Sequence, residues 1–242
     1  MPTSDSTLVI GTWNLDRPKT DTQPKSRRIL EEITKVNADI WVLTETNSCI
    51  QPGPDYVPFA TSPLLGCSFS RGETYQKGEN RTTIWVKREL KAEQLPEYSN
   101  WHSSICVAVK GTSFGDINIY GTVIGIYGLG PDFDEGLEVQ IDDWRKLKEL
   151  GNMCIAGDFN VFLEDSTSHS KDARQKLRAV FEQLDLEVPS QDIPKNVDHI
   201  AVPRSLSGAV VRPICKWNEG QDGNPPDRNV SDHMGICLTL KR

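Results

Sequence analysis

The tetrapeptide Gly157-Asp158-Phe159-Asn160 (GDFN) constrains the fold most, because it follows the short apolar run Met153–Ala156. Such a run, closed by a glycine, is typical of a buried β-strand. Side chains two residues apart on a strand point to the same side of the sheet. We therefore expect Asp158 and Asn160 to reach one small polar target together at the end of this strand.

Polar residues stand at the ends of several other strand-like runs. They are Asn14 after Leu8–Trp13, Glu45 after Asp39–Thr44, Asp198 within Val197–Val202, and Ser231-Asp232-His233 before Met234–Leu240. Taken singly, each has an ordinary interpretation as a turn residue or a solvated side chain. If the strands share one core, these ends can meet along a single rim and form one site.

Strand alternation decides which of these side chains can meet. Glu45 falls on the same face as Trp41 and Leu43, where an ionised carboxylate needs a partner such as a metal ion. Asp198 and His199 fall on opposite faces, so only one of them can easily enter a common site. We expect Asp198 to be that residue and His199 to be structural.

The remaining pattern predicts strands in runs, with helices between some of them. Predicted strands cover Thr7–Asn14, Asp39–Thr46, Thr82–Lys87, Ser104–Lys110, Ile117–Gly125, Met153–Gly157, Val197–Val202, Ala209–Trp217 and Gly235–Leu240. Helical spacing predicts helices over Ser26–Asn37, around Leu137–Leu150 and over Ala173–Leu186, and Cys49–Pro63 is expected to be a Pro-rich loop. The pattern indicates an α/β or α+β sandwich, with helices outside mixed sheets, in one domain over residues 1–242.

Composition narrows the choice of function and location. The net charge of −7 disfavours a protein that coats nucleic acid nonspecifically, but carboxylates that bind a metal also make an enzyme acidic. No apolar run reaches the roughly 20 residues of a membrane span, and the N-terminus lacks a signal pattern, so a cytoplasmic location is expected. The six scattered cysteines are expected to be reduced, with Cys49 and Cys67 as the one pair worth checking.

In this order, the motifs resemble those of the endonuclease/exonuclease/phosphatase superfamily, the fold of pancreatic-type deoxyribonucleases and abasic-site endonucleases. The matching residues are Trp13-Asn14, Thr44–Thr46, GDFN, Val197–Ile200 and Ser231–His233. The resemblance implies a four-layer α/β/β/α sandwich and a Mg²⁺-dependent site at one edge, with Mn²⁺ as an alternative metal.

The resemblance also implies roles for individual residues. Glu45 would be the chief metal ligand, with Asn14 and Asp232 nearby. Asp158 would orient or deprotonate water, Asn160 would hold the phosphate, and Asp198 would pair with His233; the choice between Asp158 and His233 as general base stays open. Many members carry a His or Tyr where this chain has Gly121-Thr122-Val123, so either that contact is missing or Tyr127 supplies it.

The expected function is hydrolysis of phosphodiester bonds, most simply by a monomeric nuclease acting on nucleic acid. Alternatives are a phosphatase or phosphodiesterase on a small or lipid-linked phosphoester, and a catalytically silent binding module on the same fold. Arg71 and Arg81 belong to a polar loop that either binds substrate phosphate or is solvated. The loop Asn218–Asn229 is expected to overhang the site near Ser231.

Overall fold

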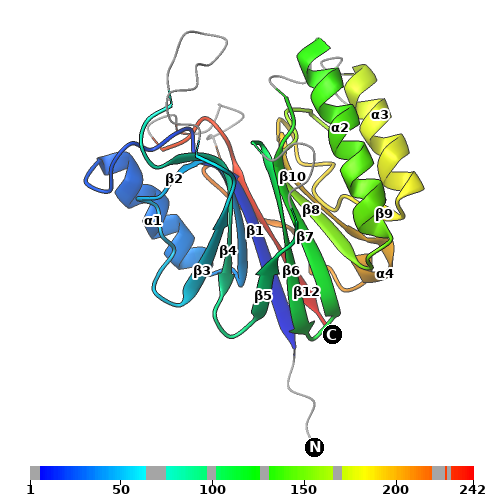
Figure 1. Ribbon diagram of the computed structural model, residues 1–242, viewed down its shortest axis with the longest axis horizontal. Coiled ribbons are helices and arrows are strands. Elements are labelled where there is room, and N and C mark those ends of the chain that lie inside the picture. Colours follow the sequence, from blue (N-terminus) through cyan, green and yellow to red (C-terminus); the bar gives the residue numbers. More distant parts are fainter. Residues whose placement is uncertain are drawn as a thin grey trace, which may run out of the picture.

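Two six-stranded sheets pack face to face in the computed structural model of the chain, and helices cover their outer faces (Figure 1). The structure describes residues 6–63, 75–96, 102–125, 131–165, 171–219, 227 and 230–242. The first sheet has the order β11 (Cys215–Trp217), β12 (Gly235–Lys241), β1 (Thr7–Asn14), β2 (Ile40–Asn47), β4 (Glu79–Lys87) and β3 (Tyr56–Ala60). The second has the order β5 (Lys91–Gln94), β6 (Ser104–Thr112), β7 (Gly115–Val123), β8 (Met153–Asp158), β10 (Asp198–Pro203) and β9 (Leu186–Glu187).

Three apolar layers hold the sandwich together. A central layer that includes Ile10, Ile84, Ile119 and Ile200 lies between the sheets. Helix α1 (Pro24–Val36) covers the first sheet, and α2 (Pro131–Lys148) and α3 (Lys171–Gln183) cover the second, while α4 (Arg204–Ser207) follows β10 (Figure 1). The predicted α/β/β/α sandwich of mixed, mostly antiparallel sheets is confirmed.

Local sequence explains where α1 begins and ends and which of its faces is buried. Pro24 stands at its first turn, where a missing N–H costs nothing, and Asn37 ends it in the left-handed conformation that Asn tolerates. Its buried residues, Ser26, Ile29 and Ile33, repeat at helical spacing and face the sheet.

The topology brings the polar strand ends to one rim. Strands β1 and β2 are parallel and joined through α1, as β7 and β8 are through α2, so β1, β2 and β8 all end at the same edge. Strand β10 runs antiparallel to β8, which places Asp198 directly opposite Asp158. Strand β12 runs antiparallel to β1 and therefore begins where β1 ends.

Two predicted segments differ in the structure, and one strand was not predicted at all. Strand β3 lies inside the stretch expected to be a loop, and it tolerates Pro58 because it is an edge strand. The Lys91–Gln94 sequence has no β-pattern, yet β5 pairs with β6. The predicted strand Ala209–Trp217 is continuous only over Cys215–Trp217, with one further bridge at Val210.

The sequence also predicted reduced cysteines and no membrane-spanning helix. Cys49, Cys106, Cys154, Cys215 and Cys237 are free, and Cys67 lies outside the described residues. Within the described ranges, no helix combines the length and the apolar character that crossing a bilayer requires.

Candidate active site

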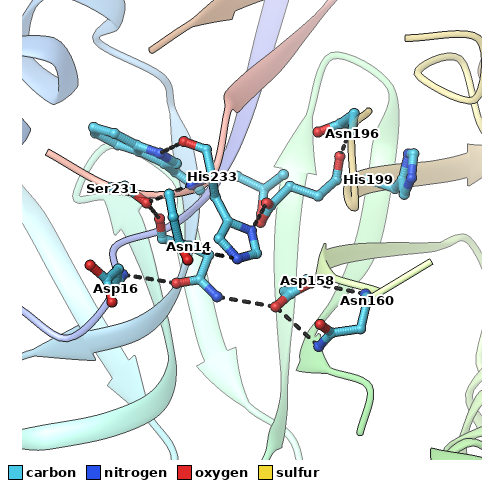
Figure 2. A network of polar contacts seen from close by, with 12 residues as sticks. Asn14, Asp16, Asp158, Asn160, Asn196, His199, Ser231 and His233 are labelled. Atoms are coloured by element: carbon cyan, nitrogen blue, oxygen red, sulfur yellow. Dashed lines mark hydrogen bonds and ion pairs between the residues drawn. The ribbon is translucent and has the colours of Figure 1, made fainter. Parts of the chain in front are cut away.

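The GDFN segment contributes a hydrogen-bonded carboxylate, Asp158, to the site. Asp158 accepts hydrogen bonds from Nδ2 of Asn14 (3.1 Å), from Nδ2 of Asn160 (3.1 Å) and from the backbone N–H of Asn160 (2.9 Å). Figure 2 shows the two carboxamides on either side of the Asp158 carboxylate, both joined to it. Asp158 and Asn160 are thus brought together, but not by strand alternation: β8 ends at Asp158, and Asn160 has a left-handed backbone (φ +52°) that lets it contact Asp158 directly.

The glycine of GDFN is explained by a close backbone approach. Gly157 has a φ of +139°, and a Cβ there would lie 1.9 Å from the carbonyl oxygen of Thr122 on the neighbouring strand. No side chain fits in that space, so β8 can pair closely with β7 only if this residue is glycine.

His233 and Asp198 form the second part of the site. Nδ1 of His233 lies 2.6 Å from Oδ2 of Asp198, which is completely buried. Ser231 supports this arrangement: its hydroxyl donates to the carbonyl oxygen of Asn14 (2.6 Å) and accepts from the backbone N–H of His233 (3.0 Å). The terminal SDH triplet is therefore tied to the end of β1.

Burial and mutual repulsion shift the ionisation of these groups. Burial raises the pKa of Asp158 to about 6, with the Asp198 charge adding to the rise and His233 opposing it. The pKa of Asp198 is likewise raised by burial and lowered in part by His233. Burial alone would lower the pKa of His233, but the Asp198 and Asp158 carboxylates outweigh it and raise that pKa well above its usual value. The two carboxyl groups therefore favour the protonated form of the His233 ring.

Glu45 approaches the same site by an irregularity that alternation does not predict. Trp41 and Leu43 face α1 in the outer apolar layer, but Glu45 has a left-handed backbone (φ +44°) that interrupts the alternation of β2. Burial raises the pKa of Glu45, repulsion from Asp158 adds to this, and Arg81 and His233 oppose it. Its charge is thus coupled to those of Asp158 and His233.

The other expected site residues are placed less centrally. Asp232 is exposed, and its Oδ1 lies 3.7 Å from Nε2 of His233. Arg81 lies within β4 and not in the expected loop, near Glu45 and the phenol of Tyr75. Arg71 and Tyr127 are outside the described residues, and Val123, in the variant GTV stretch, is buried.

His199 takes the structural position expected for it. Its ring is buried against Phe159, with Nδ1 at 3.1 Å from the Ser190 hydroxyl and Nε2 at 3.2 Å from the Val161 carbonyl oxygen. Figure 2 shows this ring well away from the ring of His233. His199 thus holds the chain that follows GDFN without entering the site.

Several residues at the rim were not expected from sequence. Asn218 donates to backbone carbonyls of the SDH triplet, and its signal was a second Trp-Asn dipeptide, Trp217-Asn218. Arg17 binds Glu79 through two nitrogens and donates its backbone N–H to the Glu45 carbonyl oxygen. Nothing in the sequence around Arg17 pointed to that role.

The donor set suits a hard cation. Potential ligand atoms of Asp158, Asp198 and His233 lie within 4.8 Å of one another, and the His233 ring could bind a cation only after losing its proton. The carboxylate of Glu45 and the carboxamide of Asn14 lie at the same rim, so oxygen donors dominate. Three acidic groups with raised pKa values repel one another, and a divalent cation would relieve that repulsion.

A model of the endonuclease/exonuclease/phosphatase family matches residues 11–233, the span that carries every motif described above. The chain belongs to the endonuclease/exonuclease/phosphatase family. Members of this family are enzymes that act on phosphoester bonds. No curated protein sequence is similar enough to this family member to count as a match.

Solved structures share the fold at low sequence identity. The endonuclease domain of TRAS1, a telomere-specific non-LTR retrotransposon, is 15% identical with a TM-score of 0.67, covering 97% of this chain and 98% of that one. The AP endonuclease LMAP from Leishmania major is 14% identical with a TM-score of 0.67 and coverages of 98% and 88%. The 3′ phosphatase NExo from Neisseria, bound to a product DNA hairpin, is 14% identical with a TM-score of 0.64 and coverages of 96% and 99%.

Proposed function

We propose that this family member is a Mg²⁺-dependent nuclease that hydrolyses phosphodiester bonds. The observation that carries the proposal is the His233 ring, which Asp198 holds with a ring nitrogen within 4.8 Å of an Asp158 carboxylate oxygen. A cationic donor beside a carboxylate base matches what a phosphodiester needs, because its oxygens are anionic and the attacking water must lose a proton.

Asp158 and His233 take different roles because their charges differ. Asp158, with a pKa of about 6, is ionised at neutral pH and can accept the proton of the attacking water as the new O–P bond forms. His233 remains charged beside Asp198 and donates a hydrogen bond to a phosphoryl oxygen. This favours Asp158 over His233 as the general base, the choice that sequence left open.

The two carboxamides orient the reacting groups. Asn14 and Asn160 both donate to Asp158 and so aim its carboxylate. To hold phosphate, Asn160 would exchange its bonds to the carbonyl oxygens of Ile124 (3.3 Å) and Gly125 (3.4 Å), and because it is neutral it would add no repulsion. Glu45, with Asn14 and Asp232, would hold Mg²⁺; Mn²⁺ satisfies the same donors. When bound, the metal neutralises phosphate charge as the bond to the leaving oxygen breaks.

Nucleic acid is the favoured substrate class because two of the structural neighbours named above are endonucleases and the third is bound to a DNA hairpin. The acidic net charge argues against tight nonspecific binding of nucleic acid. We therefore expect cleavage to depend strongly on a local feature of the substrate. Small and lipid-linked phosphoesters remain the alternative class, to be separated by experiment.

The test is a substrate panel with purified protein. It comprises bis-p-nitrophenyl phosphate, single- and double-stranded DNA with and without an abasic site, RNA, and phosphorylated inositols and lipids, each with Mg²⁺, Mn²⁺ or EDTA. We expect metal-dependent cleavage of a nucleic acid by wild type and its loss in Asp158→Asn. Asp143→Asn is the matched control, since Asp143 is an equally buried carboxylate on α2 that accepts a hydrogen bond from the Tyr120 hydroxyl. Full activity in Asp158→Asn would overturn the proposal.

A further inference from the structure

Asn218 binds the two carbonyl groups that flank Asp232. Its Nδ2 lies 2.8 Å from the carbonyl oxygen of Ser231 and 2.7 Å from that of His233. A carboxamide nitrogen carries two hydrogens, so each can serve one of these acceptors. One side chain thereby fixes the backbone on both sides of a single residue.

The position of Asn218 is itself fixed by Trp217. The Trp217 ring contacts Trp13 and Trp41 edge-on, each at 5.7 Å between centroids. It also lies so close to Gly235 that a Cβ there would be 2.1 Å from the indole. The end of β11 is therefore held tightly against the start of β12, and a residue placed there is a rigid support.

The Trp-Asn dipeptides at the ends of β1 and β11 lie on either side of β12. Trp13 donates its indole N–H to the carbonyl oxygen of His233 (3.1 Å), the same atom that Asn218 binds. Asn14 turns toward Asp158, whereas Asn218 turns toward the SDH backbone. His233 is thus held from both neighbouring strands.

The backbone conformation of Asn218 agrees with this role. Its φ of +54° is left-handed, a region that Asn occupies more readily than most residues. Glycine would adopt the same backbone without strain, so the amide can be removed while the chain path is kept.

We propose that Asn218 is a positioning residue for the hydrolysis: it fixes the backbone around Asp232 and so aims the His233 ring at Asp198 and Asp158. The inference rests on the function proposed above and deepens it. Asn218 does not touch the reacting atoms; it acts through His233 and Asp232. Supporting residues of this kind commonly change activity by about 10- to 100-fold.

The kinetic test compares Asn218→Gly and Asn218→Asp with wild type on the substrate that the panel identifies. Asn218→Asp keeps the size of the side chain but turns an oxygen toward two carbonyl oxygens. We expect kcat to fall about 10- to 100-fold in both variants, with KM changed about twofold at most. The matched control is Asn37→Gly, because Asn37 also has a left-handed backbone (φ +50°) but caps α1 at the opposite end of β2 from Glu45.

A second readout needs no substrate. In metal-free protein labelled with ¹⁵N-histidine, the proton of the His233 Nδ1–H to Asp198 bond should give a downfield resonance in wild type and Asn37→Gly. It should be lost or broadened in Asn218→Gly, at a temperature where melting curves show every variant folded. If wild type cleaves nothing in the panel, the proposed function fails, yet this resonance still tests the positioning role. A resonance unchanged in Asn218→Gly, or a kcat equal to that of Asn37→Gly, overturns the inference.

Discussion

Nδ1 of His233 lies 2.6 Å from Oδ2 of Asp198, although the two residues are 35 positions apart in the chain. Because Asp198 is fully buried and the side chain of His233 is 16% exposed, only the imidazole of this pair is open to solvent. The ionised carboxylate keeps a proton on Nδ1 and fixes the orientation of the ring. The two residues should therefore act as one unit.

Substitution of either partner should remove most of the rate. We expect Asp198→Asn to lower kcat by about 10²- to 10⁴-fold with little change in KM, because the ring loses its fixed orientation and its charge. His233→Gln should lose a similar factor. The double variant should be no slower than the worse single variant, as measured by steady-state kinetics. Strictly multiplicative losses would show that the residues act independently.

Removal of the Glu45 charge should stabilise the metal-free protein. The pKa of Glu45 is raised, so its ionised form opposes folding above that pKa, and Glu45→Gln removes the penalty. We expect a higher melting temperature in EDTA at about pH 8, together with a smaller rise on adding Mg²⁺ than wild type shows.

Glu79→Gln is the matched control for that measurement. Glu79 is also buried but pairs with Arg17 at 2.9 Å, so its loss should cost about 2 kcal/mol, or roughly 5 °C. If Glu45→Gln lowers the melting temperature as Glu79→Gln does, Glu45 has a structural partner rather than a metal-binding role.

Much of the fold was predictable because local periodicity and burial agree. Ile29 and Ile33 repeat at helical spacing and are buried, and Ile10 alternates with Trp13 between the inner and outer layers. Asn14 and Asp158 could be placed at one rim because both end apolar strands. In each case a short stretch of sequence carries enough information to orient the side chain.

The remainder depends on partners distant in sequence. Lys91–Gln94 becomes a strand because β6 offers an open edge, not because its residues favour strands. Glu45 reaches the site through a left-handed backbone that parity cannot foresee. Asn218 finds its acceptors in a segment that begins 13 residues later, so the second Trp-Asn dipeptide marks the residue but does not identify its partner.

Gly157→Ala should destabilise the fold far more than an ordinary glycine substitution. The new methyl group would meet the Thr122 carbonyl at 1.9 Å, and backbone atoms cannot move aside cheaply. We expect a loss above about 3 kcal/mol by urea denaturation. Gly151→Ala is the matched control, because Gly151 has a similar φ (+127°) but nothing within 4 Å, and backbone strain alone should cost about 1–2 kcal/mol. Equal losses would mean that the Thr122 contact contributes nothing.

His199 should make stability fall in mild acid. Nε2 faces a carbonyl oxygen and so carries the proton, while Nδ1 accepts from Ser190, and burial lowers the pKa of the ring to about 4. Unfolded, the ring titrates near its ordinary value of 6.5. Between these values the unfolded chain binds a proton that the folded chain does not, so the contribution of His199 is complete above pH 6.5 and is lost as the pH falls toward 4.

The difference between wild type and His199→Gln isolates this effect, because glutamine can keep the donor to Val161 but does not titrate in this range. From urea denaturation in EDTA, the advantage of wild type should shrink by about 2 kcal/mol between about pH 7.5 and about pH 5. Asp158, whose pKa is raised to about 6, contributes to stability with the opposite sign, because its ionised form opposes folding. The stability gained by Asp158→Asn should therefore shrink as the pH falls over the same range. An advantage over His199→Gln that stays constant with pH would show that the pKa of His199 is not lowered by folding, and the prediction would be wrong.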